Sequence, residues 1–296
     1  MLSILIPIYN YDVRPFVKEL SLQSELLEYE VEIICMDDAS SSDFRSLNAE
    51  IVNYSNVRCV QSEEKLGRSA VRNALVELSR FENLLLLDCD GKCTSENYLK
   101  NYAKEWDKYD VIYGGRVYDK EAPDDHDLYF HWFCGSLREG LLVGQRRLNP
   151  YKSFMTNNFL IRKAVYEKIK MDETLVGYGH EDTLFAQELK RAGLTISHID
   201  NPIEHIGIET KEVFLQKSDN GVKNLAQLIK ANQVDDSIRL VRFYHKMKRW
   251  RLIGVITILV THFDKNIQQS LSGPAPNLMW FDFWKLSLLH QYMKAD

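Results

Sequence analysis

Cysteine is scarce in this sequence, and it forms no recognisable motif. The 296 residues include five cysteines, an odd number with no CxxC pair. This pattern excludes the disulfide framework of small secreted domains, and no second Cys/His pair completes a zinc site around Cys89 and Cys93. We therefore expect reduced cysteines in a reducing compartment.

Long apolar runs are also missing. The longest, Leu252 to Val260, is far shorter than the roughly 20 residues that a membrane-spanning helix needs. The opening segment MLSILIPIYN has no basic stretch before its apolar residues, so we expect no secretory signal peptide. These two absences predict a cytoplasmic location.

Nothing in the composition marks an excess of positive charge. The 37 basic residues are outnumbered by 42 acidic ones, which gives a formal net charge of -5. Nucleic-acid-binding domains usually carry a basic face, so we expect no nucleic-acid partner. No GxGxxG follows an apolar run, which argues against a dinucleotide-dependent oxidoreductase. Apolar residues make up 45% of the chain, enough for a substantial core.

Short apolar runs and amphipathic segments alternate along the first two thirds of the chain. Runs that are apolar on both faces, with helices between them, are typical of an α/β fold with a mostly parallel, doubly wound sheet. The predicted strands are Leu2–Ile8, Val31–Met36, Val57–Gln61, Leu84–Leu87, Val111–Tyr113, Thr156–Ile161 and Thr195–Ile199. The predicted helices between them are Phe16–Leu27, Arg68–Arg80 and Thr183–Ala192.

A helical region is expected after the α/β part. Its predicted helices are Lys211–Ala231, Ser237–Phe263 and Asn277–Met293, with a break at Ser272–Pro276. We therefore expect one domain over residues 1–210 and a helical region over residues 211–296.

Polar clusters follow three of the predicted strands: Tyr9-Asn10, Asp37-Asp38 and Asp88–Asp90. In doubly wound sheets, ligands bind outside the carboxyl ends of the strands. Asp88 and Asp90 start on one side of their strand, with Cys89 turned away. Such a pair suits a divalent metal ion that also binds substrate phosphates, and a solvated acidic turn is the alternative.

Two arginines open the predicted helix that begins at Arg68. Gly67 permits a close approach there, and the N-terminus of a helix favours anions. Arg68 and Arg72 are four residues apart and project from one helical face, where guanidinium groups suit phosphates. Two solvated surface arginines are the alternative.

Glu181 and Asp182 open the predicted helix that follows two glycines. Acids at a helix start ordinarily cap the helix, and the functional alternative is a general base for an acceptor hydroxyl. His205 is a candidate for completing the coordination of the metal. The loops at Glu121–Lys152 and Phe154–Asn158 are the expected acceptor pocket, and the candidate acceptor residues are Asn158, Tyr178 and His180.

In this order and spacing, these motifs resemble the family 2 glycosyltransferases, which have the GT-A fold. The resemblance covers roughly residues 1–210 and is carried by Ile6-Pro7-Ile8-Tyr9-Asn10, Asp37-Asp38-Ala39-Ser40, Gly67 with Arg72-Asn73, Asp88-Cys89-Asp90 and Gly179-His180-Glu181-Asp182. It implies an inverting enzyme that transfers a hexosyl or acetylhexosaminyl group from a nucleotide-sugar donor, most commonly a UDP-sugar. The implied acceptor is a glycan or a lipid-linked molecule of polysaccharide biosynthesis, and the implied cofactor is Mn²⁺ or Mg²⁺.

The resemblance also implies roles for individual donor-site residues. The nucleoside would be held by Pro7, Tyr9, Asn10, Asp37 and Asp38, and the base or the diphosphate would be approached by Gly67, Arg68 or Arg72. Asp88 and Asp90 would bind ribose and metal, with Asp90 the closer metal ligand, and Cys89 between them would belong to the donor site. Asp182 would be the catalytic base and Glu181 its substitute. Lys65 and Val71 stand where the family usually has Asn and Ala, which weakens the assignment of base recognition.

Two other functions fit parts of the sequence. One is a non-catalytic sugar-nucleotide binding or assembly protein of the same fold. The other is a sugar nucleotidyltransferase, although Tyr9-Asn10-Tyr11-Asp12 stands where its Gly-rich loop is expected.

The region from Ser237 to Phe263 contains no acidic residue, and basic residues crowd its first half. Its Lys246–Trp250 segment approaches the QxxRW pattern of processive synthases but lacks the Gln, which favours single-sugar transfer. We weigh three interpretations of the C-terminal helices. They are a peripheral contact with the inner face of an anionic membrane, a dimer contact, and a core helix with a solvated basic end.

Overall fold

The computed structural model describes residues 1–175 and 177–295. These residues form two compact units, and each is described by itself. The sheet unit comprises Met1–Asp119, Glu139–Leu175 and Glu181–Gly207, and the helical unit comprises Lys120–Arg138, residues 177–180 and residues 208–295. Among the described residues, no helix combines the length and the apolar character needed to cross a bilayer.

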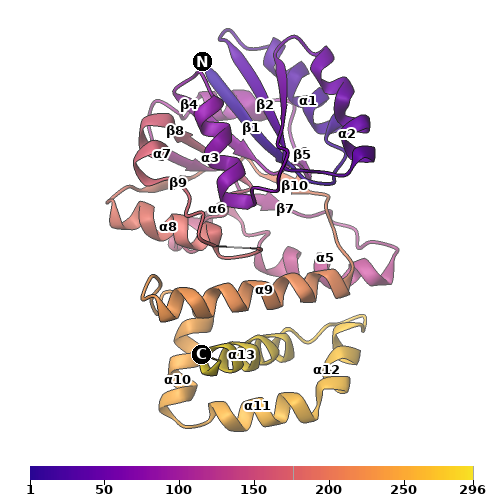
Figure 1. Ribbon diagram of the computed structural model, residues 1–296, viewed down its shortest axis with the longest axis vertical. Coiled ribbons are helices and arrows are strands. Elements are labelled where there is room, and N and C mark those ends of the chain that lie inside the picture. The colour runs from indigo at the N-terminus through magenta and orange to yellow at the C-terminus, as the bar shows by residue number, and fades with distance from the viewer. Residues whose placement is uncertain (176, 296) are drawn as a thin grey trace. The chain divides into compact units, whose positions relative to one another are not determined.

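The sheet unit is built on a seven-stranded sheet with the order β3-β2-β1-β4-β8-β6-β9 (Figure 1). Its strands are β1 (Leu2–Ile8), β2 (Val31–Asp37), β3 (Val57–Gln61), β4 (Asn83–Leu87), β6 (Val111–Tyr113), β8 (Asn158–Arg162) and β9 (Ile196–His198). Only β8 runs antiparallel to its neighbours, β4 and β6. The predicted α/β fold with a mostly parallel sheet is confirmed.

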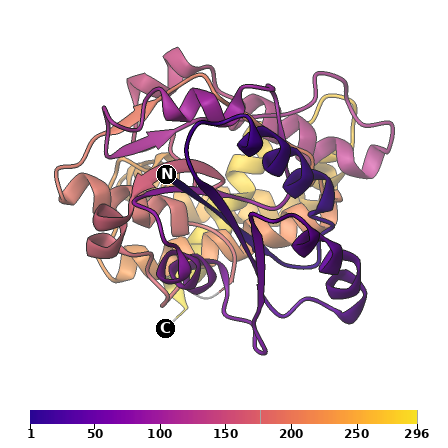
Figure 2. The same ribbon diagram turned by 90° about the horizontal axis from the view of Figure 1, so that it is seen from above.

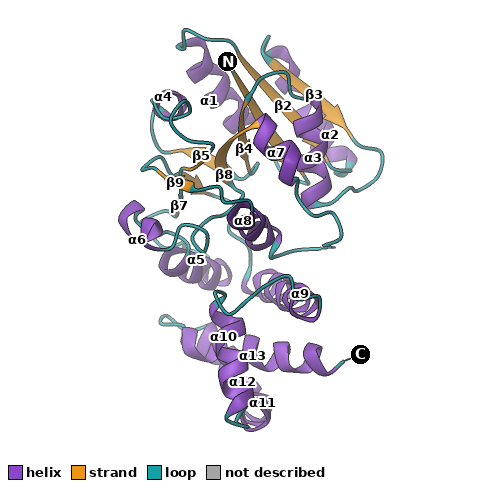
Figure 3. Ribbon diagram, turned by 90° about the vertical axis from the view of Figure 1, so that its left-hand side faces the viewer, coloured by secondary structure: helices purple, strands orange, loops and turns teal. Residues whose placement is uncertain are grey.

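Both faces of this sheet are covered by helices, which explains why its strands are continuous apolar runs. In β1, Ile4 and Ile6 pack in the core layer under α1 (Arg14–Glu25) and α4 (Tyr98–Ala103). Leu5 packs on the opposite face. That face is covered by α3 (Arg68–Leu78), α7 (Lys163–Ile169) and α8 (Glu181–Arg191). Figures 2 and 3 show α1 and α3 on opposite sides of the strands.

Three short helices and a small second sheet complete the sheet unit. After β2 come α2 (Ser42–Asn48) and the 3-10 helix η1 (Ala49–Asn53), and α6 (Val143–Leu148) lies within the second segment of the unit. A second, three-stranded sheet has the order β5-β10-β7, from β5 (Gly91–Cys93), β10 (Ile203–His205) and β7 (Arg116–Val117). The sequence patterns did not predict this small sheet.

The helical unit consists of α5 (His126–Arg138), α9 (Lys211–Lys230), α10 (Arg239–Arg249), α11 (Ile253–His262), α12 (Asp264–Leu271) and α13 (Leu278–Lys294). Its core lies around α13, where Leu286 and Leu289 are fully buried. Within this unit, α13 lies between α9 and α11 (Figures 1 and 3).

Two predictions about secondary structure are wrong. The single helix expected over Ser237–Phe263 is divided, because α10 ends at Arg249 and Arg251 adopts a left-handed conformation with φ of 58°. The amide of Leu252 donates to the carbonyl of Met247 at 3.0 Å, which terminates α10 in the manner of a helix C-cap. The loop expected over Glu121–Lys152 contains α5 and α6, and α5 forms because Phe130 and Cys134 are buried in the helical unit.

Candidate functional site

The ends of β1, β2 and β4 meet at one edge of the sheet, as the sequence predicted. Ile8 is opposite Asp37 in the parallel pairing of β1 with β2, and Leu5 is opposite Leu86 of β4. The loops after β1 and β2 are joined directly, because Asn10 accepts a hydrogen bond from the amide of Ser41 at 2.8 Å. This edge therefore brings together polar residues from three strand ends.

The two aspartates after β2 are both engaged by the protein. The Asp37 side chain accepts hydrogen bonds from Arg45 Nε at 2.9 Å and from the backbone amide of Ser40 at 3.0 Å. Asp38 accepts from the amides of Leu66 at 2.6 Å and Gly67 at 3.1 Å. Asp38 thus fixes the loop in front of α3, where Gly67 has φ of 89°, a conformation that favours glycine. Their predicted contact with the nucleoside stays a prediction.

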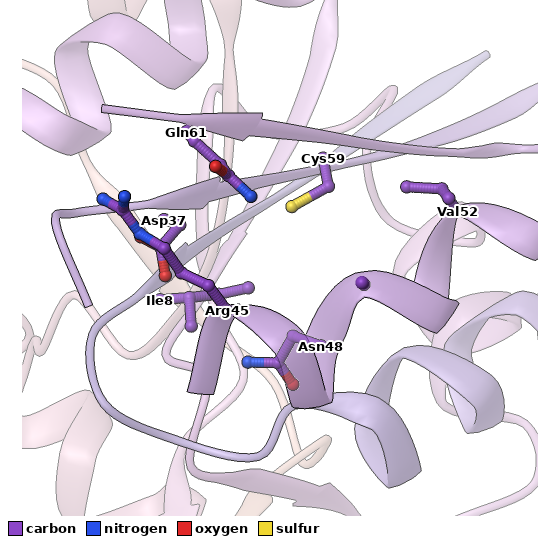
Figure 4. Close-up of a pocket in the computed structure, with 8 residues that line it drawn as sticks. Ile8, Asp37, Arg45, Asn48, Val52, Cys59 and Gln61 are labelled. Atoms are coloured by element: carbon purple, nitrogen blue, oxygen red, sulfur yellow. The ribbon is translucent and has the colours of Figure 1, made fainter. Parts of the chain in front are cut away.

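A small cavity lies beside Asp37, beneath α2 (Figure 4). Its volume is about 210 Å³, and it is lined by Ile8, Asp37, Arg45, Asn48, Ala49, Val52, Cys59 and Gln61. Small-molecule sites typically measure roughly 300–1,000 Å³, so this cavity alone is too small for a nucleotide. Arg45 closes one side, where it donates to Asp37 and to the carbonyl of Ser62 at 2.8 Å.

Tyr9 presents an aromatic ring at the end of β1. The residue is 46% exposed, and Lys65 Nζ lies 3.5 Å from the centroid of its ring. Pro7, two residues earlier, is half-buried. The lysine that departs from the family pattern therefore covers one face of the ring, and a planar ligand would compete with it.

Asp88 is surrounded by three arginines. Arg72, which is 2% exposed, donates a hydrogen bond to Asp88 Oδ1. The guanidinium nitrogens of Arg116 and Arg68 lie 3.6 and 3.8 Å from Asp88 Oδ2. The sequence predicted Arg68 and Arg72 near this position. It gave no signal for Arg116, which lies on the two-residue strand β7.

Arg116 also links Asp88 to a second acid, Glu139, which is half-buried. Its NH1 lies 2.9 Å from Glu139 Oε2, and the hydroxyl of Tyr118 donates to the same oxygen at 2.5 Å. Burial acts to raise the pKa of Glu139, but Arg116 and Tyr118 outweigh it, so the pKa lies below the usual value. Glu139 is therefore an ionised, positioned carboxylate that the sequence analysis missed.

Asp90 and His205 are brought together by the second sheet. His205 is opposite Gly91 in the antiparallel pairing of β10 with β5, and its Nδ1 lies 3.4 Å from Asp90 Oδ1. Burial acts to raise the pKa of Asp90, but the His205 ring outweighs it, followed by Arg116, so the pKa lies well below its usual value. A carboxylate next to an imidazole is a ligand pair for a divalent ion.

The same turn of chain leaves no room for a side chain beside Asp90. A Cβ atom on Gly207 would lie 2.6 Å from Asp90 Oδ2, and the amide of Ile206 donates to the carbonyl of Asp90 at 3.0 Å. Glycine is required here by close packing, since the segment after β10 passes directly over the carboxylate. The position of Asp90 therefore depends on this segment.

The charges of the residues around Asp88 and Asp90 show whether a metal ion would fit there. Asp88, Asp90, Glu139 and Glu181 provide four carboxylates against the three arginines, and Asp182 adds a fifth acid. A divalent cation would offset this excess, and Asp90 with His205 offers it ligands. In residues 1–175 and 177–295, however, no group of three His, Cys, Asp or Glu is arranged to hold a metal. Asp88, the third predicted ligand, faces arginines instead.

Glu181 and Asp182 are the first residues of α8, and they have different environments. Glu181 is 9% exposed and pairs with Arg68 Nε. Burial acts to raise its pKa, but Arg68 outweighs this, so the pKa is lowered. Asp182 Oδ1 accepts from the amide of Thr183 at 2.7 Å, and burial together with Glu181 raises the pKa of Asp182 to about 7. Asp182 is thus the acid poised to exchange a proton near neutrality.

Two of the predicted site residues, Asn158 and Cys89, have side chains in protein environments that the structure defines. Asn158 is fully buried, and its side chain makes four hydrogen bonds, to the hydroxyls of Tyr98 and Tyr102 and to the carbonyls of Gly115 and Asn201. An amide with all its bonds satisfied inside the protein is structural, so we leave Asn158 out of the site. Cys89 is half-buried, and burial raises the pKa of its thiol, which is therefore neutral.

The other candidate acceptor residues, Tyr178 and His180, belong to the helical unit. Lys217 Nζ lies 5.1 Å from the centroid of the Tyr178 ring, and Asn224 donates to the carbonyl of Tyr178 at 3.3 Å. His180 has φ of 72°. Their contact with an acceptor stays a prediction.

Comparisons with known proteins agree with this geometry. The model of the family "Glycosyl transferase family 2" matches residues 3–170, and no curated protein sequence matches the chain. Three of the solved structures that are similar to this chain follow. Each is less than 25% identical to it, so the likeness shows the fold alone.

The structure of S. aureus TarS is 17% identical with a TM-score of 0.53, and the match covers 77% of this chain and 43% of TarS. This chain therefore aligns with less than half of TarS. The mannosyltransferase PcManGT from Pyrobaculum calidifontis, in complex with GDP-Man and Mn²⁺, is 15% identical with a TM-score of 0.62 over 100% of this chain and 87% of that one. TarS 1–349 in complex with UDP-GlcNAc is 16% identical with a TM-score of 0.51 over 99% and 90%.

The family model covers more than half of the chain, and the neighbouring structures share its fold. The sheet edge carries the acids and arginines of the predicted motifs in the predicted order. From this match we conclude that the chain is a glycosyltransferase of the GT-A fold and belongs to glycosyltransferase family 2.

Proposed function

We propose that this enzyme transfers a hexosyl or acetylhexosaminyl group from a UDP-sugar to a hydroxyl of a glycan or lipid-linked acceptor, with inversion at the anomeric carbon. The observation that carries the proposal is the group of arginines and acids around Asp88 and Asp90 at the carboxyl edge of the sheet. This edge is where ligands of doubly wound sheets bind.

The arginines suit the diphosphate of the donor. Arg68 and Arg116 lie within ion-pair distance of Asp88 but more than 3.5 Å away, and they are held by Glu181 and Glu139, so their remaining nitrogens would be the ones offered to a phosphate. Arg72 is held more firmly, since it also donates to the carbonyl of Arg68 at 2.8 Å. The neighbours PcManGT and TarS were solved with GDP-Man and UDP-GlcNAc, which supports a nucleotide-sugar donor.

Asp90 and His205 are the residues that would hold a divalent metal ion, Mn²⁺ or Mg²⁺. The PcManGT structure is a Mn²⁺ complex, which supports such a cofactor in this fold. When bound, the ion would supply positive charge against the diphosphate leaving group. His205 already lies beside the carboxylate, so the protein needs no large rearrangement to present both ligands.

Asp182 is proposed as the general base, and its pKa near 7 supports this role. The acceptor hydroxyl gives its proton to Asp182 while its oxygen forms a bond to the anomeric carbon. The bond from that carbon to the diphosphate breaks at the same time, and the electron pair leaves with the diphosphate. Glu181, the substitute candidate, is committed to Arg68.

Calorimetric titration tests the donor site. UDP and GDP are titrated, each with and without Mn²⁺, into wild type, Asp90→Ala and His205→Ala. Asp107→Ala, an exposed acid of the sheet unit, is the matched control. We expect one nucleotide to bind in a metal-dependent way and to bind about tenfold or more weakly in Asp90→Ala and His205→Ala, but not in Asp107→Ala.

The outcomes separate the parts of the proposal. Equal binding with and without Mn²⁺ would contradict the metal assignment, and failure of both nucleotides to bind would contradict the donor assignment. Binding without turnover on any acceptor would favour the non-catalytic alternative. A cytoplasmic location belongs to the same proposal, and the odd number of cysteines without a CxxC pair supports a reducing compartment.

A further inference from the structure

Helix α11 of the helical unit is apolar on its outer side as well as on its buried side. Ile253 and Val260 are buried, and they belong to the two cores of the unit. The opposite side leaves large apolar side chains in solvent, with exposed fractions from 40% at Phe263 to 70% at Ile258. We call the exposed set the outer stripe: Trp250, Leu252, Val255, Ile258, Leu259 and Phe263.

The members of this stripe recur at the spacing of one helical face. Leu252, Val255 and Ile258 follow one another at intervals of three, with Leu259 and Phe263 continuing the row. A helix that is apolar all round is normally buried, so an exposed row of this kind marks an interaction surface. In Figure 1, α11 lies on the side of α13 opposite to α9. The exposed fractions of the stripe residues show that their side chains are open to solvent.

Uncompensated cations lie at the start of this stripe. No acidic residue occurs between Ser237 and Phe263. Two of the seven basic residues from Arg239 to Arg251 are paired, Arg239 with Asp282 at 3.2 Å and His245 with Asp236 at 2.6 Å. The remaining five have no ion pair among residues 1–175 and 177–295, and all are exposed: Arg242, Lys246, Lys248, Arg249 and Arg251.

The cations and the stripe are adjacent along the chain, because α10 is followed directly by α11. Lys246 Nζ lies 4.6 Å from the centroid of the Trp250 ring, the first member of the stripe. The turn between the two helices is only three residues, Trp250 to Leu252, and it contains both Arg251 and apolar members of the stripe. A charged group and an apolar group are therefore available to the same partner.

We propose that the outer stripe and the five cations bind the surface of an anionic phospholipid membrane. The apolar side chains would enter the boundary between head groups and acyl chains, and the cations would contact lipid phosphates. A second copy of the chain fits less well, because a symmetric contact through this surface would bring two sets of uncompensated cations together. No residue of the proposed donor site takes part, so the proposal is independent of the proposed function.

Flotation of the full chain with vesicles tests this proposal. The probes are vesicles of pure phosphatidylcholine and vesicles in which about a third of the lipid is phosphatidylglycerol, at low and at high salt. We expect wild type to float with the anionic vesicles only, and less so at high salt. Equal binding to both compositions, or no binding to either, would overturn the proposal.

Variants locate the binding surface. Ile258→Glu places a charge in the stripe and should weaken vesicle binding about tenfold or more. Arg242→Gln combined with Arg249→Gln should weaken it roughly twentyfold, at about fivefold for each cation. The matched controls lie in the sheet unit. Leu148→Glu is the control for Ile258→Glu, since Leu148 is 79% exposed. Lys104→Gln with Lys168→Gln is the control for the double arginine variant, since both lysines are exposed.

All of these side chains are exposed, so every variant should keep the thermal unfolding midpoint of wild type. Vesicle binding that persists in both stripe and charge variants would contradict the assigned surface. Analytical ultracentrifugation tests the alternative partner, a second copy of the chain, by measuring whether the protein is a dimer. A dimer that Ile258→Glu dissociates, with no vesicle binding in wild type, would show that the surface is a contact between copies and would overturn the lipid assignment.

Discussion

Replacing Asp182 by Asn should stabilise the protein at pH 8 while removing most of its activity. The pKa of Asp182 is raised to about 7, against 3.8 for an ordinary aspartate, because burial and the adjacent Glu181 disfavour its ionised form. The unfolded chain thus loses this proton near pH 4, whereas the folded chain keeps it until about pH 7. Between these values the folded state binds more protons, so the free energy of unfolding falls as the pH rises.

The size of the effect follows from the pKa. At 1.36 kcal/mol for each tenfold change, the full difference corresponds to roughly 4 kcal/mol. The carboxyl is partly exposed and interacts with Glu181, so we expect a gain on the order of 2 kcal/mol in Asp182→Asn at pH 8 and almost none at pH 4. Asn retains an oxygen that accepts from the amide of Thr183, so the start of α8 is preserved.

Urea unfolding at pH 4 and pH 8 measures the gain, and transfer assays measure the loss of kcat. A general base contributes roughly 10²- to 10⁴-fold, so Asp182→Asn should lose at least about a hundredfold. In wild type, kcat/KM should rise with pH through about 7, as Asp182 loses its proton. A variant that is less stable at pH 8, or that keeps its rate, would refute this reasoning.

Glu181→Gln provides the control with the opposite sign. The pKa of Glu181 is lowered despite its burial, because Arg68 pairs with it. Its contribution to stability is therefore present above pH 4.5 and is lost as the pH falls through the lower, folded-state pKa. Glu181→Gln should destabilise the protein at pH 8, and two neighbouring acids of one helix turn should thus give opposite results.

Two further predictions concern the donor site. Arg116→Gln should weaken UDP binding roughly tenfold and leave uridine binding unchanged, because Arg116 faces the expected diphosphate. Arg116→Lys should have an intermediate effect on UDP binding. Calorimetry with UDP and with uridine checks this, and an equal loss of uridine binding would contradict the assignment. Gly207→Ala should move the Asp90 carboxylate, since the new Cβ would lie 2.6 Å from its Oδ2. We expect it to reduce Mn²⁺-dependent nucleotide binding while the far-ultraviolet circular dichroism stays that of wild type, and unchanged metal dependence would speak against the close contact.

The sequence was sufficient to predict the main sheet and part of the candidate site. Periodicity revealed the buried strands, and the rule that parallel strands end at one edge placed Asp37 near Asp88. The helix starts at Arg68 and Glu181 were predicted within a few residues. These features are local in the chain or follow from one simple topological rule.

The rest depended on contacts between distant segments. Strands of two or three residues, such as β7 and β10, carry no periodic signal, so no pattern indicated that Arg116 lies beside Asp88. His205 was a candidate metal ligand from the sequence, but its position beside Asp90 follows from the pairing of β10 with β5. Asn158 lies in the predicted strand Thr156–Ile161 and at the end of the expected acceptor loop, but nothing in the sequence indicated its four partners, which come from three separate segments. The end of α10 at Arg249 contains neither glycine nor proline, so the sequence did not predict that the helix ends there.

The pairing of β5 with β10 also affects how the protein can be divided. Lys92 and Glu204, which form an ion pair at 3.0 Å across these strands, are 112 residues apart in the chain. The family model ends at residue 170, before Glu181, Asp182 and His205. A fragment that ends at residue 170 would keep the strand ends and the three arginines. It would lose Asp182, whose pKa is about 7, and the His205 imidazole beside Asp90. Folding must close this long loop before the site is complete, because β10, the last strand in the order of the chain, is the one that carries His205.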